Sequence, residues 1–124
     1  MGSVLVVDGA NVVGSRPDGW WRDRAKAAAR LHGRLAVADT SYDEIVLILE
    51  GQAKGGVRAG RDAHLRTVHA ARDGDATIVE ACVQAVAKGH QVVVITADRG
   101  LAMRAEGAGA RVMSPSWLID LVGY

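Results

Sequence analysis

The sequence predicts an α/β fold, a three-layer α/β/α sandwich around a mainly parallel sheet of four to five strands. Two observations predict it. Short continuous apolar runs have the pattern of strands buried on both faces of a parallel sheet. These runs alternate with segments whose apolar residues recur at helical spacing. The 124 residues show no repeat, linker or shift in composition, so we expect a single domain over residues 1–124.

The first half of the chain contains two predicted strands and one predicted helix. The run "SVLVVD" at 3–8 predicts the first strand, which a polar turn follows. A helix is expected from Trp20 to about Ala38, because Ala28, Leu31 and Leu35 recur with basic residues between them. The run "EIVLILE" at 44–50 predicts the second strand. The stretch 51–64 is rich in glycine and basic residues, and we expect a flexible loop there.

The second half alternates strands and helices more regularly. The strand "QVVVITAD" has the clearest apolar run of the chain, whereas "LRTVHA" has the weakest. Helix-start and helix-stop residues set the expected boundaries. The expected elements are a strand at 65–70, a helix at 75–89 ending at Gly89, a strand at 91–98, a helix at 99–106, a strand at 110–113 and a helix opened by Ser114 and Pro115.

Composition excludes some classes of protein. Lys and Arg number 15 against 14 Asp and Glu, a formal charge of +1, so attraction to a polyanion must be local. Cys82 is the single cysteine, which rules out an intramolecular disulfide, favours a reducing compartment and fits a core position. The sequence has no basic leader and no long apolar segment. We therefore expect a cytoplasmic protein with no membrane partner.

Four acidic residues are expected at one edge of the sheet. Asp8, Glu50 and Asp98 each close a predicted strand, and Asp75 begins the helix that leads into the fourth strand. Ligands gather outside the carboxyl ends of parallel strands. Clustered carboxylates repel one another unless protons or cations neutralise them, and hard oxygen ligands favour Mg²⁺ or Mn²⁺. The alternative is structural, because aspartates also cap helices and turns, and Glu50 can be a solvated strand end.

A cation in this position suggests a reaction. A divalent metal can polarise a phosphoryl oxygen and activate a water for in-line attack, which is phosphodiester hydrolysis. Asn11 lies one turn beyond Asp8, where its amide could orient a phosphate or a metal-bound water. Its alternative role is to stabilise the turn.

The segments "VVDGANVVG", "DATIV" and "VVVITADRG" resemble, in this order, the NYN domains of the PIN-like nucleases, particularly the short YacP-like type. The resemblance implies a PIN-like sheet in the order 3-2-1-4-5 and a metal-dependent ribonuclease. It implies that Asp8, Asn11, Asp75 and Asp98 occupy active-site positions, with Thr96 beside them.

Two positions depart from the family pattern. The second strand of such proteins commonly ends in aspartate, but here it ends in Glu50. The YacP-like helix reads D-x-x-I-E, whereas here Val79 follows Ile78 and the glutamate is Glu80. One residue along a helix turns a side chain by about 100°, so Glu80 does not simply replace the family's glutamate.

The expected partner is RNA. Basic side chains near the acidic edge can hold a backbone through phosphate contacts without reading sequence. Trp20 and Trp21 can stack unpaired bases, although a core or interface position is the alternative for at least one of them. The candidate RNA-contacting residues are Arg16, Lys54, Arg58, Arg61, Thr96 and Arg99.

Other functions fit less well. The stretch from Gly9 to Gly14 lacks the middle glycine of a dinucleotide fingerprint, and Asp8 would repel a pyrophosphate. An aspartate-nucleophile phosphatase would need a carboxylate where Ala10 stands, and the histidines have no metal-ligand spacing. The rival is a catalytically weak or inactive RNA-binding or partner-binding module of the same fold. A PIN-type toxin is a third reading, and the sequence leaves open the substrate and self-association into a homo-oligomer.

Overall fold

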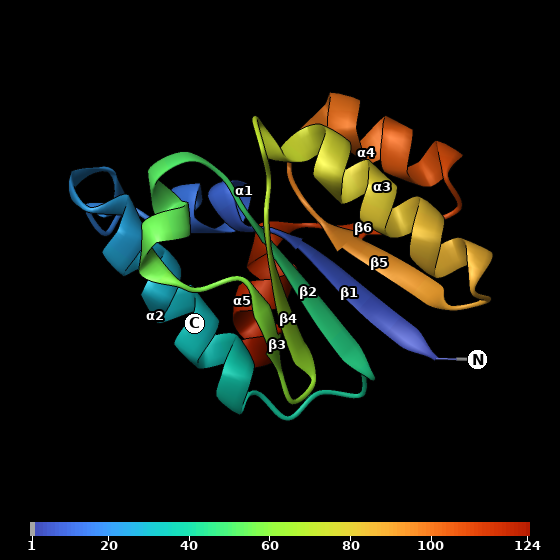
Figure 1. The fold of residues 1–124 in the computed structure, drawn as a ribbon, viewed down its shortest axis with the longest axis horizontal. Coiled ribbons are helices and arrows are strands. Elements are labelled where there is room, and N and C mark those ends of the chain that lie inside the picture. The colour runs from blue at the N-terminus through green and yellow to red at the C-terminus, as the bar shows by residue number, and fades with distance from the viewer. Residues whose placement is uncertain (1) are drawn as a thin grey trace.

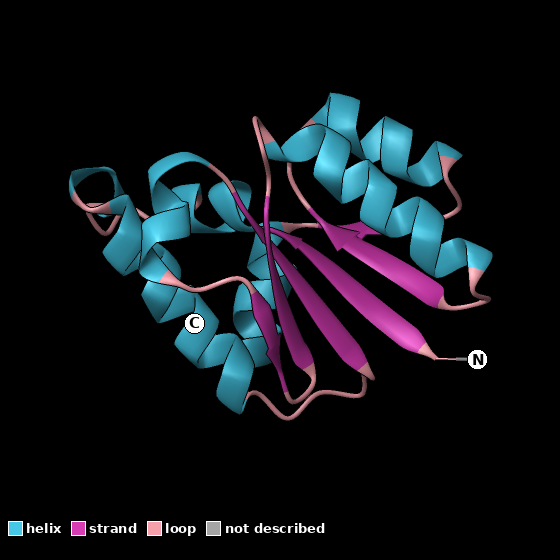
Figure 2. Ribbon diagram, viewed as in Figure 1, coloured by secondary structure: helices cyan, strands magenta, loops and turns pink. Residues whose placement is uncertain are grey.

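Six strands form one mostly parallel sheet with helices on both faces in the computed structural model, which describes residues 2–124 (Figures 1 and 2). The strands are β1 (Ser3–Asp8), β2 (Glu44–Leu49), β3 (Gly60–Asp62), β4 (Leu65–His69), β5 (Gln91–Ile95) and β6 (Arg111–Met113). Their order in the sheet is β3-β4-β2-β1-β5-β6. The five predicted strands therefore have the expected order 3-2-1-4-5, and β3 is an additional edge strand.

Strand β3 lies within the stretch expected to be a flexible loop, and that expectation is wrong. A 3₁₀ helix, η2 (Gly51–Gly56), and β3 occupy most of it. All three residues of β3 are exposed, so no apolar alternation predicted a strand there. The strand forms because it pairs antiparallel with the outer edge of β4, with Gly60 opposite Thr67 and Asp62 opposite Leu65.

The helices differ from the predicted ones mainly at their starts. They are α1 (Gly9–Gly14), η1 (Trp20–Arg22), α2 (Arg24–Val37), α3 (Gly74–Ala87), α4 (Arg99–Gly107) and α5 (Pro115–Val122). The expected turn after β1 is the short helix α1. The helix expected from Trp20 begins at Arg24 instead, because Asp23 accepts a hydrogen bond from the Lys26 N–H and acts as its N-cap.

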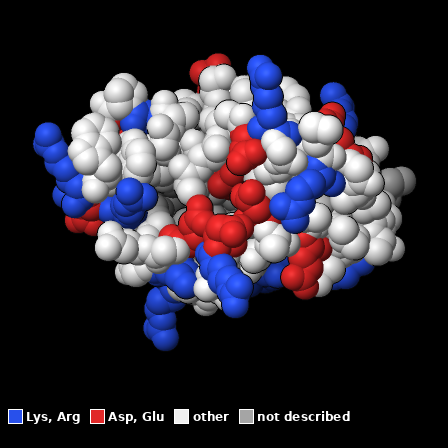
Figure 3. All heavy atoms as spheres, turned by 90° about the horizontal axis from the view of Figure 1, so that it is seen from above, with Lys and Arg blue, Asp and Glu red and all other residues white. Residues whose placement is uncertain are grey.

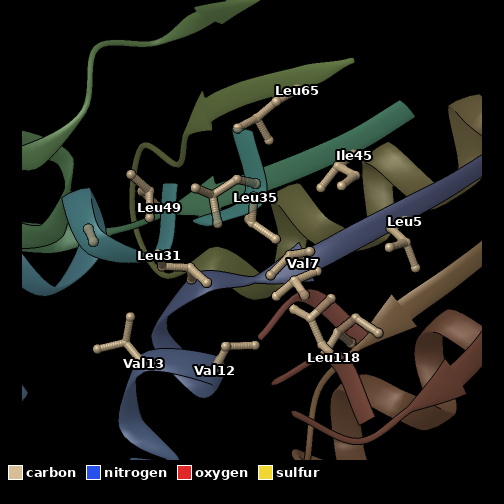
Figure 4. Close-up of a cluster of buried hydrophobic side chains, with 14 of the residues drawn as sticks. Leu5, Val7, Val12, Val13, Leu31, Leu35, Ile45, Leu49, Leu65 and Leu118 are labelled. Carbon is tan, nitrogen blue, oxygen red and sulfur yellow. The ribbon is translucent and has the colours of Figure 1, made fainter. Parts of the chain in front are cut away.

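Alternate residues of each central strand enter two separate cores, which is why the apolar runs are continuous. Leu5 and Val7 of β1 face α1, α2 and α5, in the core that Figure 4 shows. Val4 and Val6 face α3 and α4 in the second core, together with Cys82. The predicted core position of Cys82 is confirmed, and its burial raises the pKa of the thiol to about 11.

A glycine brings the first helix close to the neighbouring strand. A Cβ atom built on Gly9 would lie 2.6 Å from the carbonyl oxygen of Ile48 and 2.9 Å from a methyl carbon of Leu49. Only glycine allows this approach without a shift of the β2 backbone. The start of α1 is therefore held against the end of β2, which fixes where Asp8 ends β1.

No helix within residues 2–124 combines the length and the apolar character that crossing a membrane requires.

Candidate active site

Acidic side chains gather around a hollow on one face of the molecule, the face seen from above in Figure 3. Parallel strands β1, β2 and β5 end at this side of the sheet, and α3 and α4 begin there. Asp8 ends β1, Glu50 follows β2, Asp98 precedes α4 and Asp75 lies in the first turn of α3. The fold thus brings the four predicted acids to one edge.

Asp8 is the most buried of these acids, with 8% of its surface exposed. One carboxylate oxygen, Oδ1, accepts a hydrogen bond from the Asn11 N–H at 3.2 Å and caps α1. The other, Oδ2, accepts from the hydroxyl of Thr96 at 3.0 Å. The two roles that the sequence allowed for Asp8, helix cap and site residue, are therefore combined in one side chain, because a carboxylate has lone pairs for both.

Thr96 joins Asp8 to Asp98. Its hydroxyl donates to Asp8 and accepts a hydrogen bond from the Asp98 N–H at 3.1 Å. Thr96 is 3% exposed, so its position suits the placing of the two acids rather than a contact with RNA.

Asn11 makes a second connection between the segment after β1 and the segment after β5. Its side-chain oxygen accepts a hydrogen bond from the Ala97 N–H at 2.8 Å. This bond spans 86 positions of the sequence and connects α1 to the β5–α4 junction. The amide oxygen is used within the fold, and the amide nitrogen remains the part of Asn11 that can donate to a ligand.

The start of α3 is capped by two acids other than Asp75. Asp73 accepts a hydrogen bond from the Asp75 N–H at 3.0 Å, and Glu50 Oε2 accepts from the Gly74 N–H at 2.8 Å. The expectation that Asp75 could serve as the N-cap is wrong, because the helix already begins at Gly74 and Asp73 takes that role. The carboxylate of Asp75 does not cap α3.

Burial and neighbouring negative charges raise the pKa of two acids of the cluster. Burial raises the pKa of Asp8, and the negative charges of Asp75 and Glu50 raise it further against the lowering effect of its two hydrogen bonds. Burial also raises the pKa of Asp75, as do the charges of Asp98 and Asp73, while Arg104 opposes the rise. Asp75 and Glu50 therefore lie close enough to disfavour the ionisation of Asp8, and Asp98 lies close enough to disfavour that of Asp75.

This donor set is compatible with a divalent cation, but the side chains do not form a closed cage around one. The oxygens are hard ligands, and a cation relieves the repulsion that raises the pKa of Asp8 and Asp75. Within residues 2–124, however, no three Asp, Glu, His or Cys side chains are arranged to ligate one ion. Mg²⁺ commonly keeps several waters and one or two carboxylates, which is the arrangement these residues can supply.

The predicted basic residues are divided between several regions. Arg99 is exposed beside Asp98 at the start of α4, and Lys54 Nζ donates to the carbonyl of Ala70, which follows β4 at the acidic edge. Arg58 is exposed after η2 and lies beside α2.

Two basic residues lie away from the acids. Arg61 forms an ion pair with Glu44, the first residue of β2, because β3 runs antiparallel and carries it toward the opposite end of the sheet. The expectation that Arg61 adjoins the acidic edge is therefore wrong. Arg16 lies over the ring of Tyr124, 4.4 Å from its centroid, and pairs with Asp18.

Three arginines near the acids were missed by sequence reasoning. Arg104 is close enough to Asp75 to lower its pKa. Arg24 and Arg72 line a pocket that also contains Glu50 and Trp20. Arg104 is six residues after Asp98, which is not a same-face helical spacing, and Arg24 and Arg72 are brought in by loop paths, so no local pattern encodes any of the three.

The departure from the family pattern in α3 can be placed in the structure. Val79 packs against the second core, and Glu80 is exposed, where its carboxylate accepts a hydrogen bond from the Gln84 side chain. Glu80 thus lies on the outer side of α3.

Of the tryptophans, Trp20 packs against the first core and Trp21 is 54% exposed.

A solved structure has the same fold. The crystal structure of a mutant of Rae1 (YacP) from Bacillus subtilis matches 98% of this chain and 75% of its own, with a TM-score of 0.75 and 19% identity. The chain has a YacP-like fold. This PIN-like fold is the one that the three motif segments resemble, and at 19% identity the match establishes the fold alone. No model of a known protein family matches the chain, and no curated protein sequence does.

Proposed function

We propose that this protein is a metal-dependent endoribonuclease whose Mg²⁺ or Mn²⁺ binds among Asp8, Asp75 and Asp98, one or two of them as direct ligands and the rest through water, with Glu50 beside them. The observation that carries the proposal is the buried carboxylate of Asp8, clamped by Thr96 and repelled by Asp75 and Glu50. Burial, and then the charges of its neighbours, raise the pKa of Asp8, so its ionised form is disfavoured unless a cation neutralises it. The YacP-like fold supports the proposal.

Each residue has a distinct part in this scheme. When bound, the metal supplies polarisation of a phosphoryl oxygen and activation of water for in-line attack. Asp8, Asp75 and Asp98 would provide its negative oxygens, one or two by direct contact and the rest through bound water. Thr96 and Asn11 position Asp8 and Asp98 through the hydrogen bonds described above.

The arginines around the acids can bind a polyanionic substrate. Arg99 is exposed at the start of α4. Arg104, also on α4, lies near Asp75 of α3. Guanidinium groups bind phosphate oxygens in a planar, bidentate manner. Since the formal net charge is only +1, these local contacts, and not a general field, hold the RNA backbone.

The test is RNA cleavage in Mn²⁺ or Mg²⁺ by the wild-type protein, Asp8→Asn and Asp98→Asn, with single-stranded and structured RNA. We expect each substitution to slow cleavage by about 10²-fold or more, the effect of removing one preorganised electrostatic group from an active site. Asp120→Asn is the matched control, because Asp120 is exposed on α5. EDTA should abolish cleavage by the wild type.

The outcomes separate the competing explanations. Cleavage that persists in both site variants indicates a contaminant and removes the support for the proposed site. RNA binding without cleavage in either metal contradicts the enzyme and favours a non-catalytic RNA-binding module.

A further inference from the structure

A pocket of about 420 Å³ opens beside the acidic cluster and is not explained by catalysis. It lies between α1, the start of α2, the end of β2 with η2, and the loop that precedes α3. Glu50 belongs both to this pocket and to the acids around Asp8. A group bound in the pocket is therefore adjacent to a phosphate bound at the acids.

One wall of the pocket is aromatic and cationic. The guanidinium carbon of Arg24 lies 4.9 Å from the centroid of the Trp20 ring, a cation–π contact. Trp20 is partly buried against the first core and therefore held in place. The wall therefore presents a fixed aromatic ring with a planar guanidinium group over it.

Two positive charges in the pocket have no acidic partner. Within residues 2–124, neither Arg24 nor Arg72 forms an ion pair or a side-chain hydrogen bond, although Glu50 and Asp73 line the same pocket. Unpaired guanidinium groups at an otherwise acidic edge are available to a ligand that carries its own negative charge.

The remaining lining supplies an apolar floor and one amide. Val13, Leu49 and Ala53 are apolar, and Gln52 can both donate and accept hydrogen bonds. A flat wall, an apolar floor, an amide and two guanidinium groups match the parts of a nucleotide, namely a planar base with polar edges and a phosphate. The volume lies within the range of small-molecule sites.

We propose that this pocket binds the base and phosphate of the nucleotide next to the scissile phosphate, so that the substrate is single-stranded RNA. The position beside a scissile phosphate rests on the proposed function. A base can enter only if it is unstacked and unpaired, which a regular duplex does not permit. Stacking on an aromatic or guanidinium plane tolerates any base, whereas Gln52 is the group able to prefer one.

The first experiment measures binding in EDTA, where cleavage does not interfere. The probes are a short fluorescein-labelled single-stranded RNA of mixed sequence and the same RNA annealed to its complement. We expect the single strand to bind more tightly than the duplex, and Arg72→Ala and Arg24→Ala each to weaken single-strand binding about tenfold. Arg34→Ala is the matched control, an exposed arginine on α2 that does not line this pocket.

The second experiment reports on the pocket wall directly. Unlabelled single-stranded RNA should quench the tryptophan fluorescence, and most of the quenching should be lost in Trp20→Phe but kept in Trp21→Phe. Trp21 is half exposed and does not line the pocket. Circular dichroism of each variant checks that the fold is retained.

Failure of this inference and failure of the proposed function give different results. If the wild type cleaves RNA and both arginine variants cleave and bind it equally well, the proposed role of the pocket is wrong. The proposed ribonuclease activity is then still supported. If the arginine variants weaken RNA binding but no metal supports cleavage, the proposed ribonuclease activity is contradicted. The proposed role of the pocket is then still supported. Equal affinity for single strand and duplex, or quenching retained in Trp20→Phe, also contradicts the pocket.

Discussion

At the scale of single residues, the hydroxyl of Thr96 is the atom that joins two acids of the site. It donates to Asp8 in a buried hydrogen bond and accepts from the Asp98 N–H in a partly buried one. Thr96 thus fixes the carboxylate of Asp8 and the backbone of Asp98, while the Asp98 carboxylate accepts from the Leu101 N–H and caps α4.

Replacing Thr96 with valine should therefore affect both stability and activity. The shape is kept, but Asp8 loses a donor and the Asp98 N–H loses its acceptor, so we expect destabilisation of about 1–3 kcal/mol in urea unfolding. The pH–rate profile should shift to higher pH, because loss of the hydrogen bond raises the pKa of Asp8 further. Thr96→Ser keeps the hydroxyl and should remain near wild type. Equal behaviour of the two variants would contradict the proposed joining role.

The raised pKa of Asp8 predicts how stability depends on pH without metal. The unfolded chain releases this proton near the ordinary value of 3.8, and the folded chain releases it at higher pH because of burial. The contribution of Asp8 to stability is thus fully present below 3.8 and is lost as the pH rises through the raised pKa. In EDTA, the Tm of Asp8→Asn minus that of the wild type should increase with pH over this interval. A difference that does not change with pH would contradict the shift.

At the scale of elements, the start of α1 depends on a close contact with β2. We expect Gly9→Ala to cost about 1–3 kcal/mol, because its Cβ would lie 2.6 Å from the Ile48 carbonyl oxygen. Gly33→Ala is the opposite case, since Gly33 lies within α2 and nothing lies within 4 Å of its Cβ position. It should stabilise the protein by about 0.5–1 kcal/mol. Chemical denaturation of the two variants measures both effects, and a destabilised Gly33→Ala would contradict the expectation for α2.

At the scale of the whole molecule, a cation that binds only the folded state should raise its stability. Mn²⁺ at about 100 times its dissociation constant is expected to add about 2.7 kcal/mol, seen as an increase in Tm. The increase should be absent in Asp8→Asn and retained in Asp120→Asn. An equal increase in all three proteins would show that the metal binds elsewhere.

The near-neutral formal charge of +1 also makes a prediction about salt. If RNA is held by a few local arginines, the affinity should depend only weakly on ionic strength. Arg72→Ala should reduce the slope of log K against log salt concentration by about 0.7, the value for one phosphate contact with a single strand. Arg34→Ala should leave the slope unchanged, and an equal reduction in both variants would indicate a diffuse basic surface instead.

The sequence by itself determined the order of the elements and the edge at which the acids meet. The apolar runs of β1, β2 and β5 are buried on both faces, so their pattern could be read locally. Since parallel strands end at the same edge, Asp8, Glu50 and Asp98 had to come together there. The short strand β3 escaped prediction because its residues are exposed and its hydrogen bonds come from a neighbouring strand.

Only the tertiary structure decided which side chains act on one another. The hydrogen bonds from Thr96 to Asp8 and from Ala97 to Asn11 cross more than 80 positions of the sequence, so no local pattern encodes them. The same holds for Arg24 and Arg72, which meet Trp20 and Glu50 in one pocket only because α2 and the loop before α3 pass the end of β2. Local sequence sets the direction of each strand and helix, whereas distances between side chains depend on how the elements pack in three dimensions.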